Sequence, residues 1–540
     1  MRALRVLATY AVAAALAACS GAAPDGATDA GPTAPPSALA PSDPTAADPA
    51  DPASALGLVE GWGPSAGELD AAATLVAGLT LRELAGQVIV APWSGTRAPT
   101  GLVGRHHLGG VIWFGDNVVS PAQVRRTNRA LRRATADRGW PLLVGVDQEG
   151  GAVARLDRGV TRLPSFMTSG AARTPRLTRD VARASGRELR ALGFTAVFAP
   201  VADVTIGPAD PTIGARSASS SPAQAAVQAL AASRGLADAG LVSPLKHFPG
   251  HGSVRADSHH TLPRQTVPLP RLRERDLRPF SEAVAGGASA VMLGHLDVRA
   301  VDPGVPSSLS RRVVDGLLRR DLGFQGLVVT DSLAMGAVAR QPADRVAVRA
   351  LRAGADVLLM PEDVSRAHAG VVRAVRAGVL PRRRLEQAAA RQVALLLHHR
   401  AARGAPPGTA RRAAAAWSRA AVTVATGPCS GRLVGRRVTP AGDARAVRAF
   451  VPAARAAGLR VGRGGTRVAF LRPGGRAVPA AVTVAVEAPW VLARSRSRVE
   501  LAAYGDTPLA MRAVVRVLVG RDRAPGRLPV RVPGVARRGC

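Results

Sequence analysis

Eight short apolar runs, spaced through residues 68–402, constrain the fold of this chain most strongly. Each run is almost continuously apolar, as expected for parallel strands that are buried on both faces. Segments with the apolar spacing of helices lie between many of them. The runs are Gln87–Trp93, Gly110–Phe114, Leu142–Asp147, Ala196–Val201, Leu241–His247, Ala290–His295, Gly326–Asp331 and Ala355–Met360. The helical segments include Val124–Arg138, Thr178–Leu192, Pro222–Ala239, Leu272–Ala285 and Arg311–Leu322.

Eight β-α units in roughly three hundred residues predict an α/β fold of the TIM type, a (β/α)8 barrel. A doubly wound open sheet is the alternative, but no Gly-x-Gly-x-x-Gly turn follows the first run. Polar residues end several runs: Asp147 the third, His295 the sixth and Asp331 the seventh, while Asp203 follows the fourth. In a barrel these strand ends meet on one face, so we expect the active site there.

The fifth run ends in the most informative stretch, Lys246-His247-Phe248-Pro249-Gly250-His251-Gly252, followed by Asp257-Ser258-His259-His260. It contains four of the ten histidines and the single lysine of a chain whose other basic residues are arginines. A compact ammonium kept against such a bias indicates a specific role for Lys246.

Three chemistries could use these residues. A metal site would take ligands from His247, His251, His259 and Asp257, but no His-Glu-x-x-His signature is present, and we expect no metal and no cofactor. A serine hydrolase would need a Gly-x-Ser-x-Gly elbow at a strand end, which the sequence lacks. The third chemistry pairs a carboxylate nucleophile, Asp331, with an acid/base histidine, His259, oriented by Asp257. Asp331 as a helix N-cap and Asp147 as a structural carboxylate remain alternatives.

The Lys246–Gly252 and Asp257–His259 stretches resemble the signature of bacterial β-N-acetylglucosaminidases (β-hexosaminidases) of glycoside hydrolase family 3, in a two-domain lipoprotein form. The resemblance extends over nearly all of the chain after its N-terminal segment. Its other motifs are Asp147-Gln148-Glu149-Gly150-Gly151, Gly214-Ala215-Arg216-Ser217, Thr330-Asp331-Ser332-Leu333-Ala334-Met335, Tyr504-Gly505-Asp506-Thr507-Pro508 and Gly526-Arg527-Leu528-Pro529-Val530. One departure is Ala218, where the family usually has Phe, so packing beneath the sugar is expected to differ.

The resemblance implies retaining hydrolysis of terminal β-linked N-acetylglucosamine from cell-wall or chitin-derived saccharides. Asp331 would be the nucleophile, and His259, held by Asp257, the acid/base. The sugar hydroxyls would be bound by Asp147, Arg216, Lys246 and His247. A β-N-acetylglucosaminide phosphorylase, a β-glucosidase and a non-catalytic cell-wall-binding lipoprotein are the alternatives. We expect a monomer.

The N-terminus resembles a lipoprotein leader. A charged start and an apolar run too short to span a bilayer form a predicted signal peptide, residues 1–18. It ends in Leu16-Ala17-Ala18-Cys19, which resembles a lipobox, so Cys19 is the predicted lipidation site. An ordinary signal peptide with an incidental cysteine is the alternative. We expect export and anchoring to the outer face of the cytoplasmic membrane through the lipid alone.

The remaining domain boundaries follow from composition. Residues 19–67 are rich in Ala, Pro and Asp and are predicted to be a disordered tether. The barrel is expected over 68–402, a linker over 403–410 and a smaller α/β sandwich domain over 411–540, with strands at 421–426, 467–471 and 481–486 and a helix opened by Thr507-Pro508. Cys429 and Cys540 could pair in an oxidising compartment.

The net charge of +34 raises the question of nucleic acid. The arginines are scattered rather than grouped, and no nucleic-acid module is visible, so we expect no such partner. Attraction to anionic cell-envelope polymers and a codon-level bias are the two explanations left open.

The lipobox predicts that Cys19→Ala releases the protein from membranes without loss of activity, because the thiol is the site of acylation. Membrane fractionation and an activity assay of each fraction check this, with Ser20→Ala as the control. Continued membrane association of the Cys19 variant would contradict the assignment.

Overall fold

The computed structural model describes residues 51–535 and Cys540. The predicted signal peptide, Cys19 and the tether up to residue 50 lie outside these residues. Residues 48–540 form one compact unit, which is the one described below. Over the described ranges, no helix is both long enough and apolar enough to cross a bilayer.

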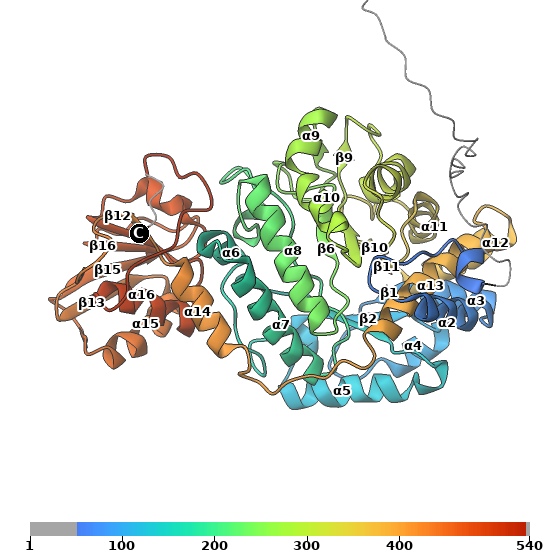
Figure 1. The fold of residues 1–540 in the computed structure, drawn as a ribbon, viewed down its shortest axis with the longest axis horizontal. Helices are drawn as coiled ribbons and strands as arrows, with labels where there is room; N and C mark the ends of the chain where they lie inside the picture. Colours follow the sequence, from blue (N-terminus) through green and yellow to red (C-terminus); the bar gives the residue numbers. More distant parts are fainter. Residues whose placement is uncertain (1–50, 536–539) are drawn as a thin grey trace, which may run out of the picture. The chain divides into compact units, whose positions relative to one another are not determined.

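Seven of the eight predicted runs contain a strand, and these strands form two parallel sheets (Figure 1). The first has the order β11-β1-β2-β3 and the second the order β10-β8-β6. Every strand residue in both sheets is buried, as predicted for parallel strands covered on both faces. Their bounds are β1 Ile89–Ala91, β2 Gly110–Trp113, β3 Leu143–Val146, β6 Leu245–Phe248, β8 Ala290–Leu293, β10 Leu327–Thr330 and β11 Leu358–Leu359.

The remaining run, Ala196–Val201, is the fourth along the chain and lies between β3 and β6 without forming a regular strand. Phe198 donates its N–H to the carbonyl of Val146 (3.0 Å), and Ala196 and Val201 make isolated parallel bridges to Val242 and Lys246. Pro200 lacks an N–H, which interrupts a ladder in this run. A further parallel bridge joins Val329 to Val357, just before β11. The two sheets are therefore connected at both of their edges.

Helices connect these strands and carry much of the apolar core. Three long helices begin with proline at the first helical position, where its missing N–H costs least. The predicted helix over 272–285 is two helices, and the one over 311–322 is a π-helix, η5 (Arg312–Asp321). The α-helices are α3 Leu81–Gln87, α4 Thr100–His106, α5 Pro121–Arg133, α6 Met167–Ala172, α7 Pro175–Ala191, α8 Pro222–Asp238, α9 Leu269–Arg275, α10 Arg278–Ala285, α11 Ala343–Ala353, α12 Val364–Arg376 and α13 Arg382–His398.

The last part of the predicted tether is ordered, which corrects the expectation for residues 51–67. Helix α1 (Pro52–Ala55) precedes α2 (Ala66–Ala77), and Leu58 and Trp62 between them are 5% and 2% exposed. The Trp62 indole N–H donates to the carbonyl of Val59 (2.7 Å). The two apolar side chains bury enough surface to fix a segment that composition alone marks as flexible.

Residues beyond 410 form a second α/β layer with its own apolar core (Figure 1). One six-stranded sheet has the order β12-β17-β16-β15-β13-β14, antiparallel between β12 and β17 and parallel elsewhere. The predicted N-cap Thr507 accepts a hydrogen bond from the N–H of Ala510 and begins α16. The helices and strands of this C-terminal part are α14 Arg411–Ala421, β12 Thr423–Thr426, β13 Arg437–Gly442, α15 Ala444–Ala456, β14 Arg460–Val461, β15 Thr466–Leu471, β16 Val482–Ala485, β17 Val499–Ala502 and α16 Pro508–Leu518.

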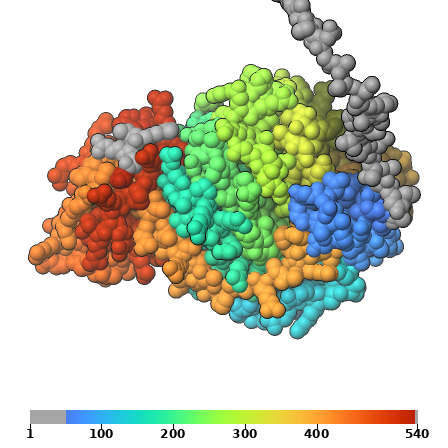
Figure 2. Space-filling model, viewed as in Figure 1, coloured from blue at the N-terminus to red at the C-terminus, as the bar shows by residue number. Residues whose placement is uncertain are grey.

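This C-terminal part packs against the segments that precede α6 and α8. Ser165 donates its backbone N–H (3.0 Å) and its hydroxyl (2.7 Å) to the carbonyl of Tyr504. Ser219 donates its hydroxyl to the carbonyl of Pro529 (2.6 Å). In Figure 1, α14 lies beside α6, and in Figure 2 the orange and red surface of these residues adjoins the green surface of α6 to α8.

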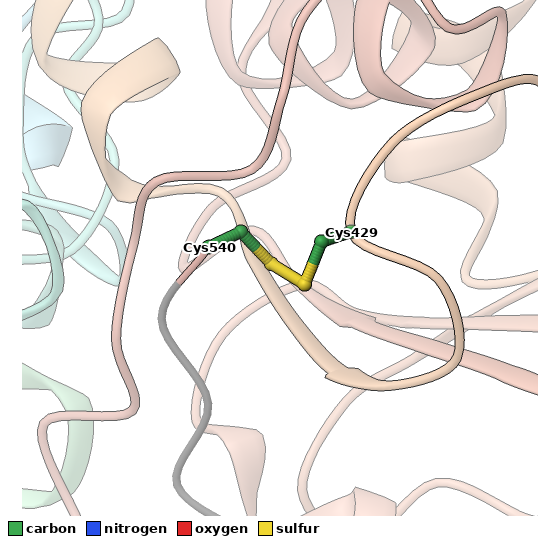
Figure 3. The surroundings of a disulfide bond; sticks show 2 residues. All are labelled: Cys429 and Cys540. Atoms are coloured by element: carbon green, nitrogen blue, oxygen red, sulfur yellow. A yellow bond between two sulfur atoms is a disulfide. The ribbon is translucent and has the colours of Figure 1, made fainter.

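Cys429 and Cys540 form a disulfide, a pairing that the sequence allowed but did not decide (Figure 3). Their Cα atoms are 5.6 Å apart, and the bond joins the loop after β12 to the last residue of the chain. A sequence separation of 111 residues makes the closed loop long. Such a cross-link removes much chain entropy from the unfolded state.

We expect the Cys429→Ser/Cys540→Ser double variant to lose about 2–4 kcal/mol of unfolding free energy, as is usual for a native disulfide. Denaturant unfolding of oxidised protein checks this, with the same protein under reducing conditions as the comparison. A midpoint equal to that of the wild type would mean that the bond does not constrain the unfolded chain.

Candidate functional site

A cavity of about 380 Å³ lies at the carboxyl ends of the parallel strands. It is lined by six of the seven residues predicted to act on the substrate: Asp147, Arg216, Lys246, His247, His259 and Asp331. The seventh, Asp257, contacts His259 directly. All residues that line the cavity fall between Ile112 and Met360, so residues beyond 410 do not line it. Side chains from distant parts of the sequence are therefore gathered as the strand-end pattern predicted.

Lys246 lies at the centre of a buried ion network. Its ammonium is 3% exposed and contacts Asp147 Oδ1 at 3.0 Å and Glu149 Oε1 at 2.6 Å. Burial alone would lower the pKa of Lys246, but the two carboxylates raise it above its usual value. The ammonium therefore stays charged in the cavity wall. The single lysine of the chain thus occupies a place where a point charge serves two carboxylates at once.

Glu149 joins this lysine to Arg216. The Arg216 guanidinium binds both Glu149 oxygens, Nε to Oε2 at 2.9 Å and Nη2 to Oε1 at 2.8 Å. Burial alone would raise the pKa of Glu149, but Arg216 and Lys246 hold it far below its usual value. Glu149 is thus an ionised carboxylate that fixes two of the predicted sugar-binding cations.

Asp203 orients His247 from behind. It is completely buried and accepts hydrogen bonds from the backbone N–H groups of His247 (3.2 Å) and His251 (2.6 Å). Its other oxygen lies 2.7 Å from His247 Nδ1. Although burial raises the pKa of Asp203, His247 and His251 lower it below the usual value, so the carboxylate is an acceptor. The Nδ1–H of His247 therefore donates to Asp203, which fixes the orientation of the ring.

Consecutive strand residues normally point to opposite faces, yet Lys246 and His247 both line the cavity. The register of β6 against β8 shifts between Leu245 and Phe248, and irregularities of this kind re-aim side chains next to active sites. Neighbouring residues at this strand end can therefore serve one site. Nevertheless, among the described residues no three His, Cys, Asp or Glu side chains are grouped as metal ligands.

Asp331 follows β10 directly and is held at the cavity by its backbone. Its N–H donates to the carbonyl of Leu293 (2.8 Å), and its Oδ1 accepts the N–H of Ser332 (2.8 Å). Burial alone would raise the pKa of Asp331, but His247, His295 and the Ser332 N–H lower it below its usual value. No helix begins at Asp331, so the N-cap alternative does not apply. An ionised carboxylate in a cavity is what a nucleophile requires.

The Asp257–His259 pair is formed as predicted. His259 Nδ1 lies 2.6 Å from Asp257 Oδ1, which also accepts the backbone N–H of His259 (2.9 Å). Burial raises the pKa of Asp257, but the backbone and ring of His259 lower it below its usual value. The His259 side chain is 59% exposed, so it stands at the mouth of the cavity, where it can reach both substrate and water.

Three hydrogen bonds hold the loop of this pair. Gly336 and Ala337, in the loop after Asp331, donate their N–H groups to the carbonyls of His259 (3.0 Å) and Ser258 (3.2 Å). His251 Nε2 lies 2.8 Å from the Ser258 hydroxyl. A Cβ at Gly336 would lie 2.5 Å from the His260 carbonyl oxygen, so this close approach requires glycine. The loops that carry Asp331 and His259 are thus bonded to each other.

Sequence reasoning undervalued Glu149 and did not find Gly336. Glu149 stands two residues after Asp147, and a period of two places both on one face of an extended segment, a signal that was available. Asp203 and His251 brace the site through their contacts to His247 and Ser258. His295 is buried between Ser308 (2.7 Å) and the Ser332 carbonyl (3.0 Å), so it supports the segment next to Asp331.

We expect Glu149→Gln to cost about 3–5 kcal/mol of unfolding free energy, because it leaves Lys246 and Arg216 buried with one carboxylate fewer. Substrate turnover should fall as well, since both cations lose their position. Denaturant unfolding and an activity assay check this. The matched control, Glu362→Gln, changes an exposed carboxylate outside the network and should do neither. Unchanged stability of the Glu149 variant would show that the network is loosely coupled.

Comparison with known proteins places this site in a family. The glycosyl hydrolase family 3 N-terminal domain matches residues 80–395. The chain is 37% identical over 314 residues to the beta-hexosaminidase LpqI of Mycobacterium tuberculosis, covering 56% of this chain and 79% of that one. It is 35% identical over 280 residues to beta-hexosaminidase A of Pseudoalteromonas piscicida, covering 48% of this chain. The chain spans about half the length of this last relative, 47%.

A solved structure extends the likeness beyond the first domain. A family 3 beta-N-acetylglucosaminidase from Paenibacillus sp. FPU-7 superposes with a TM-score of 0.77 at 30% identity, covering 84% of this chain and 99% of that one. The matched residues 80–395 contain every side chain described at the cavity and make up more than half of the chain. The chain therefore belongs to glycosyl hydrolase family 3.

Proposed function

We propose that the chain is a retaining β-N-acetylglucosaminidase that removes a terminal β-linked N-acetylglucosamine from a small saccharide. One observation carries the proposal: the ionised carboxylate of Asp331 and the Asp257-bound imidazole of His259 belong to one cavity, on two loops that hydrogen-bond to each other. The names of the relatives, beta-hexosaminidase and beta-N-acetylglucosaminidase, support the choice of sugar.

In the first step, Asp331 attacks the anomeric carbon while the bond to the leaving-group oxygen breaks. His259, protonated and stabilised by the Asp257 carboxylate, gives its proton to that oxygen. A glycosyl ester of Asp331 forms and the aglycone leaves. In the second step, neutral His259 takes a proton from water, whose oxygen displaces Asp331 at the same carbon. Two inversions give net retention.

The buried charged groups of the cavity are suited to binding the sugar hydroxyl groups and take no direct part in the reaction. Lys246 and Arg216 present N–H donors whose positions are fixed by Glu149, and Asp147 presents an acceptor. His247, whose ring Asp203 holds in place, adds a further polar group to the cavity wall. Hydroxyl groups of a sugar ring can pair with each of these, and pre-set partners reduce the entropy lost on binding.

We also propose that the eight segments close into a (β/α)8 barrel. The parallel pairings run from β11 through β1, β2, β3, the 196–201 segment, β6, β8 and β10 to Val357 next to β11. This order returns to its starting strand, which supports closure. The chemistry would then lie at the carboxyl face of the barrel, as in other enzymes of this architecture.

The remaining proposals concern location and substrate. The lipobox-like Cys19 supports export and a lipid anchor on the outer face of the cytoplasmic membrane. That location favours saccharides of the cell wall or of chitin as substrates. We also propose that the enzyme is a monomer and that it uses no cofactor. These proposals rest on the sequence.

Asp331 and His259 should differ in how they depend on the leaving group. The nucleophile serves every substrate, so Asp331→Ala should abolish turnover of a natural disaccharide and of a nitrophenyl glycoside alike. An acid is needed chiefly for a basic leaving group. His259→Ala should therefore cripple disaccharide hydrolysis by about 10²–10⁴-fold but give a burst with the nitrophenyl substrate. Asp257→Ala should show a milder form. Steady-state and stopped-flow assays check this.

Azide separates the two roles further. It attacks without a general base, so it should restore turnover in the His259 variant and not in the Asp331 variant. The same assays with and without phosphate, monitored for sugar 1-phosphate, test the phosphorylase alternative, because a neutral histidine repels phosphate less than a carboxylate would. If the His259 variant loses equal activity on both kinds of substrate and azide does not restore its turnover, the acid/base is another residue.

A further inference from the structure

A second cavity, of about 590 Å³, lies at the opposite ends of the same strands. Arg319 donates to the carbonyls of Phe324 (3.2 Å) and Gly326 (2.6 Å), which precede β10, whereas Asp331 follows β10. A four-residue strand separates the two places by on the order of 13 Å. The cavity is thus distinct from the catalytic one and has no part in the proposed hydrolysis.

The lining of this cavity is strongly cationic. Five arginines line it, Arg311, Arg319, Arg352, Arg384 and Arg391, against one acidic residue, Asp315. Arg311 and Arg352 are exposed at its mouth, whereas Arg319 and Arg391 are nearly buried. Guanidinium groups match oxyanions through paired N–H donors, so this composition favours phosphate over neutral ligands.

The carboxylate beneath the cavity does not satisfy these charges. Asp356 is fully buried and accepts from Arg319 (2.6 Å), Arg384 (3.0 Å) and Arg391 (3.2 Å), so three guanidinium groups share one carboxylate. Arg384 uses Nη2 for Asp356 and for the Ala355 carbonyl, while its buried Nη1 has no hydrogen-bond partner among the described residues. One donor of the cluster is therefore left unused.

The pKa shifts of Arg319 and Arg384 agree with this geometry. Burial lowers the pKa of Arg319 to about 9, with Asp356 opposing the change and Arg391 and Arg384 adding to it. Burial also lowers the pKa of Arg384. Asp356 again opposes this change, and Arg391 adds to it. Mutual repulsion of this kind is relieved by a bound anion.

The cavity wall is partly apolar. Val379, which is 48% exposed, Leu380, Pro381 and Ala353 line it beside the arginines. A volume of this size exceeds what one phosphate ion fills and is that of a small-molecule site. A phosphate group with a small organic body attached would use both the cationic and the apolar surfaces.

We propose that this arginine cavity binds a small phosphate compound, either inorganic phosphate or a phosphate monoester. The phosphate would accept from Arg384 Nη1 and from the arginines at the mouth, and an ester's organic body would lie against Val379 and Pro381. The bound dianion would stabilise the folded chain through linkage, because the unfolded chain has no such cluster.

Titration calorimetry and thermal unfolding of the full chain test the proposal, with inorganic phosphate and glycerol 3-phosphate as probes. We expect saturable 1:1 binding with a Kd at or below about 1 mM, accompanied by a rise in Tm. The tighter of the two probes identifies the source of the phosphate group. Saturating N-acetylglucosamine, which fills the catalytic cavity under the proposed function, should leave this binding unchanged.

Two variants on one helix locate the site. Arg352 and Arg345 are both exposed on α11, but only Arg352 lines the cavity. Arg352→Gln should weaken phosphate binding by about fivefold or more, while Arg345→Gln should leave it unchanged. Both should keep the Tm of the wild type without phosphate, since neither residue is buried. A second variant, Arg384→Lys, keeps the charge but loses Nη1 and should weaken binding as well.

The proposal is overturned by any of three results. These are no saturable heat at about 10 mM phosphate, equal affinities of the Arg352 and Arg345 variants, and loss of binding when N-acetylglucosamine is added. The last result would place the phosphate in the catalytic cavity instead. A failure of hydrolysis assays leaves the proposal intact, because the two cavities share no residue.

Discussion

The candidate site depends on the buried charges around Lys246. Asp147 and Glu149 are paired with Lys246 and Arg216 in a wall that excludes most water, and Arg155 lies 3.8 Å from Asp147. Removing charges from water is costly, and only the short contacts to opposite charges offset that cost. The network therefore requires the residues that follow β3 to lie close to the end of β6. This constraint places the proposed sugar-binding groups at fixed positions relative to Asp331.

The proposed nucleophile and acid/base are held differently, because Asp331 directly follows β10 whereas His259 lies on a loop. Asp331 is bonded through its backbone to the end of β8, whereas His259 is exposed on a loop that Gly336, Ala337 and His251 hold in place. Under the proposed mechanism, a rigidly held Asp331 and a more accessible His259 suit a reaction in which the histidine reaches a leaving group first and water second. The contact at Gly336 couples the two loops, so a shift of one displaces the other.

Much of this could be read from the sequence, for identifiable reasons. Uniformly apolar runs predicted the parallel strands, and the polar residues that end them predicted which side chains converge. The single lysine marked the position where a point charge is needed. Burial and pairing could not be read in the same way: the place of Glu149 between two cations depends on Arg216, 67 residues further on. Composition failed for residues 51–67, because a few apolar side chains such as Trp62 order a segment that is otherwise rich in small and polar residues.

The central claim is that Asp331 becomes covalently bound to the sugar. Some enzymes that cleave N-acetylglucosaminides use the acetamido group of the substrate instead of a protein nucleophile. The direct test is mass spectrometry of the His259→Ala variant, quenched in acid after the burst with a nitrophenyl N-acetylglucosaminide and digested with protease. The account predicts one N-acetylhexosaminyl group on the peptide that contains Asp331. An unmodified Asp331 peptide at full burst amplitude, or the sugar on another residue, would contradict it.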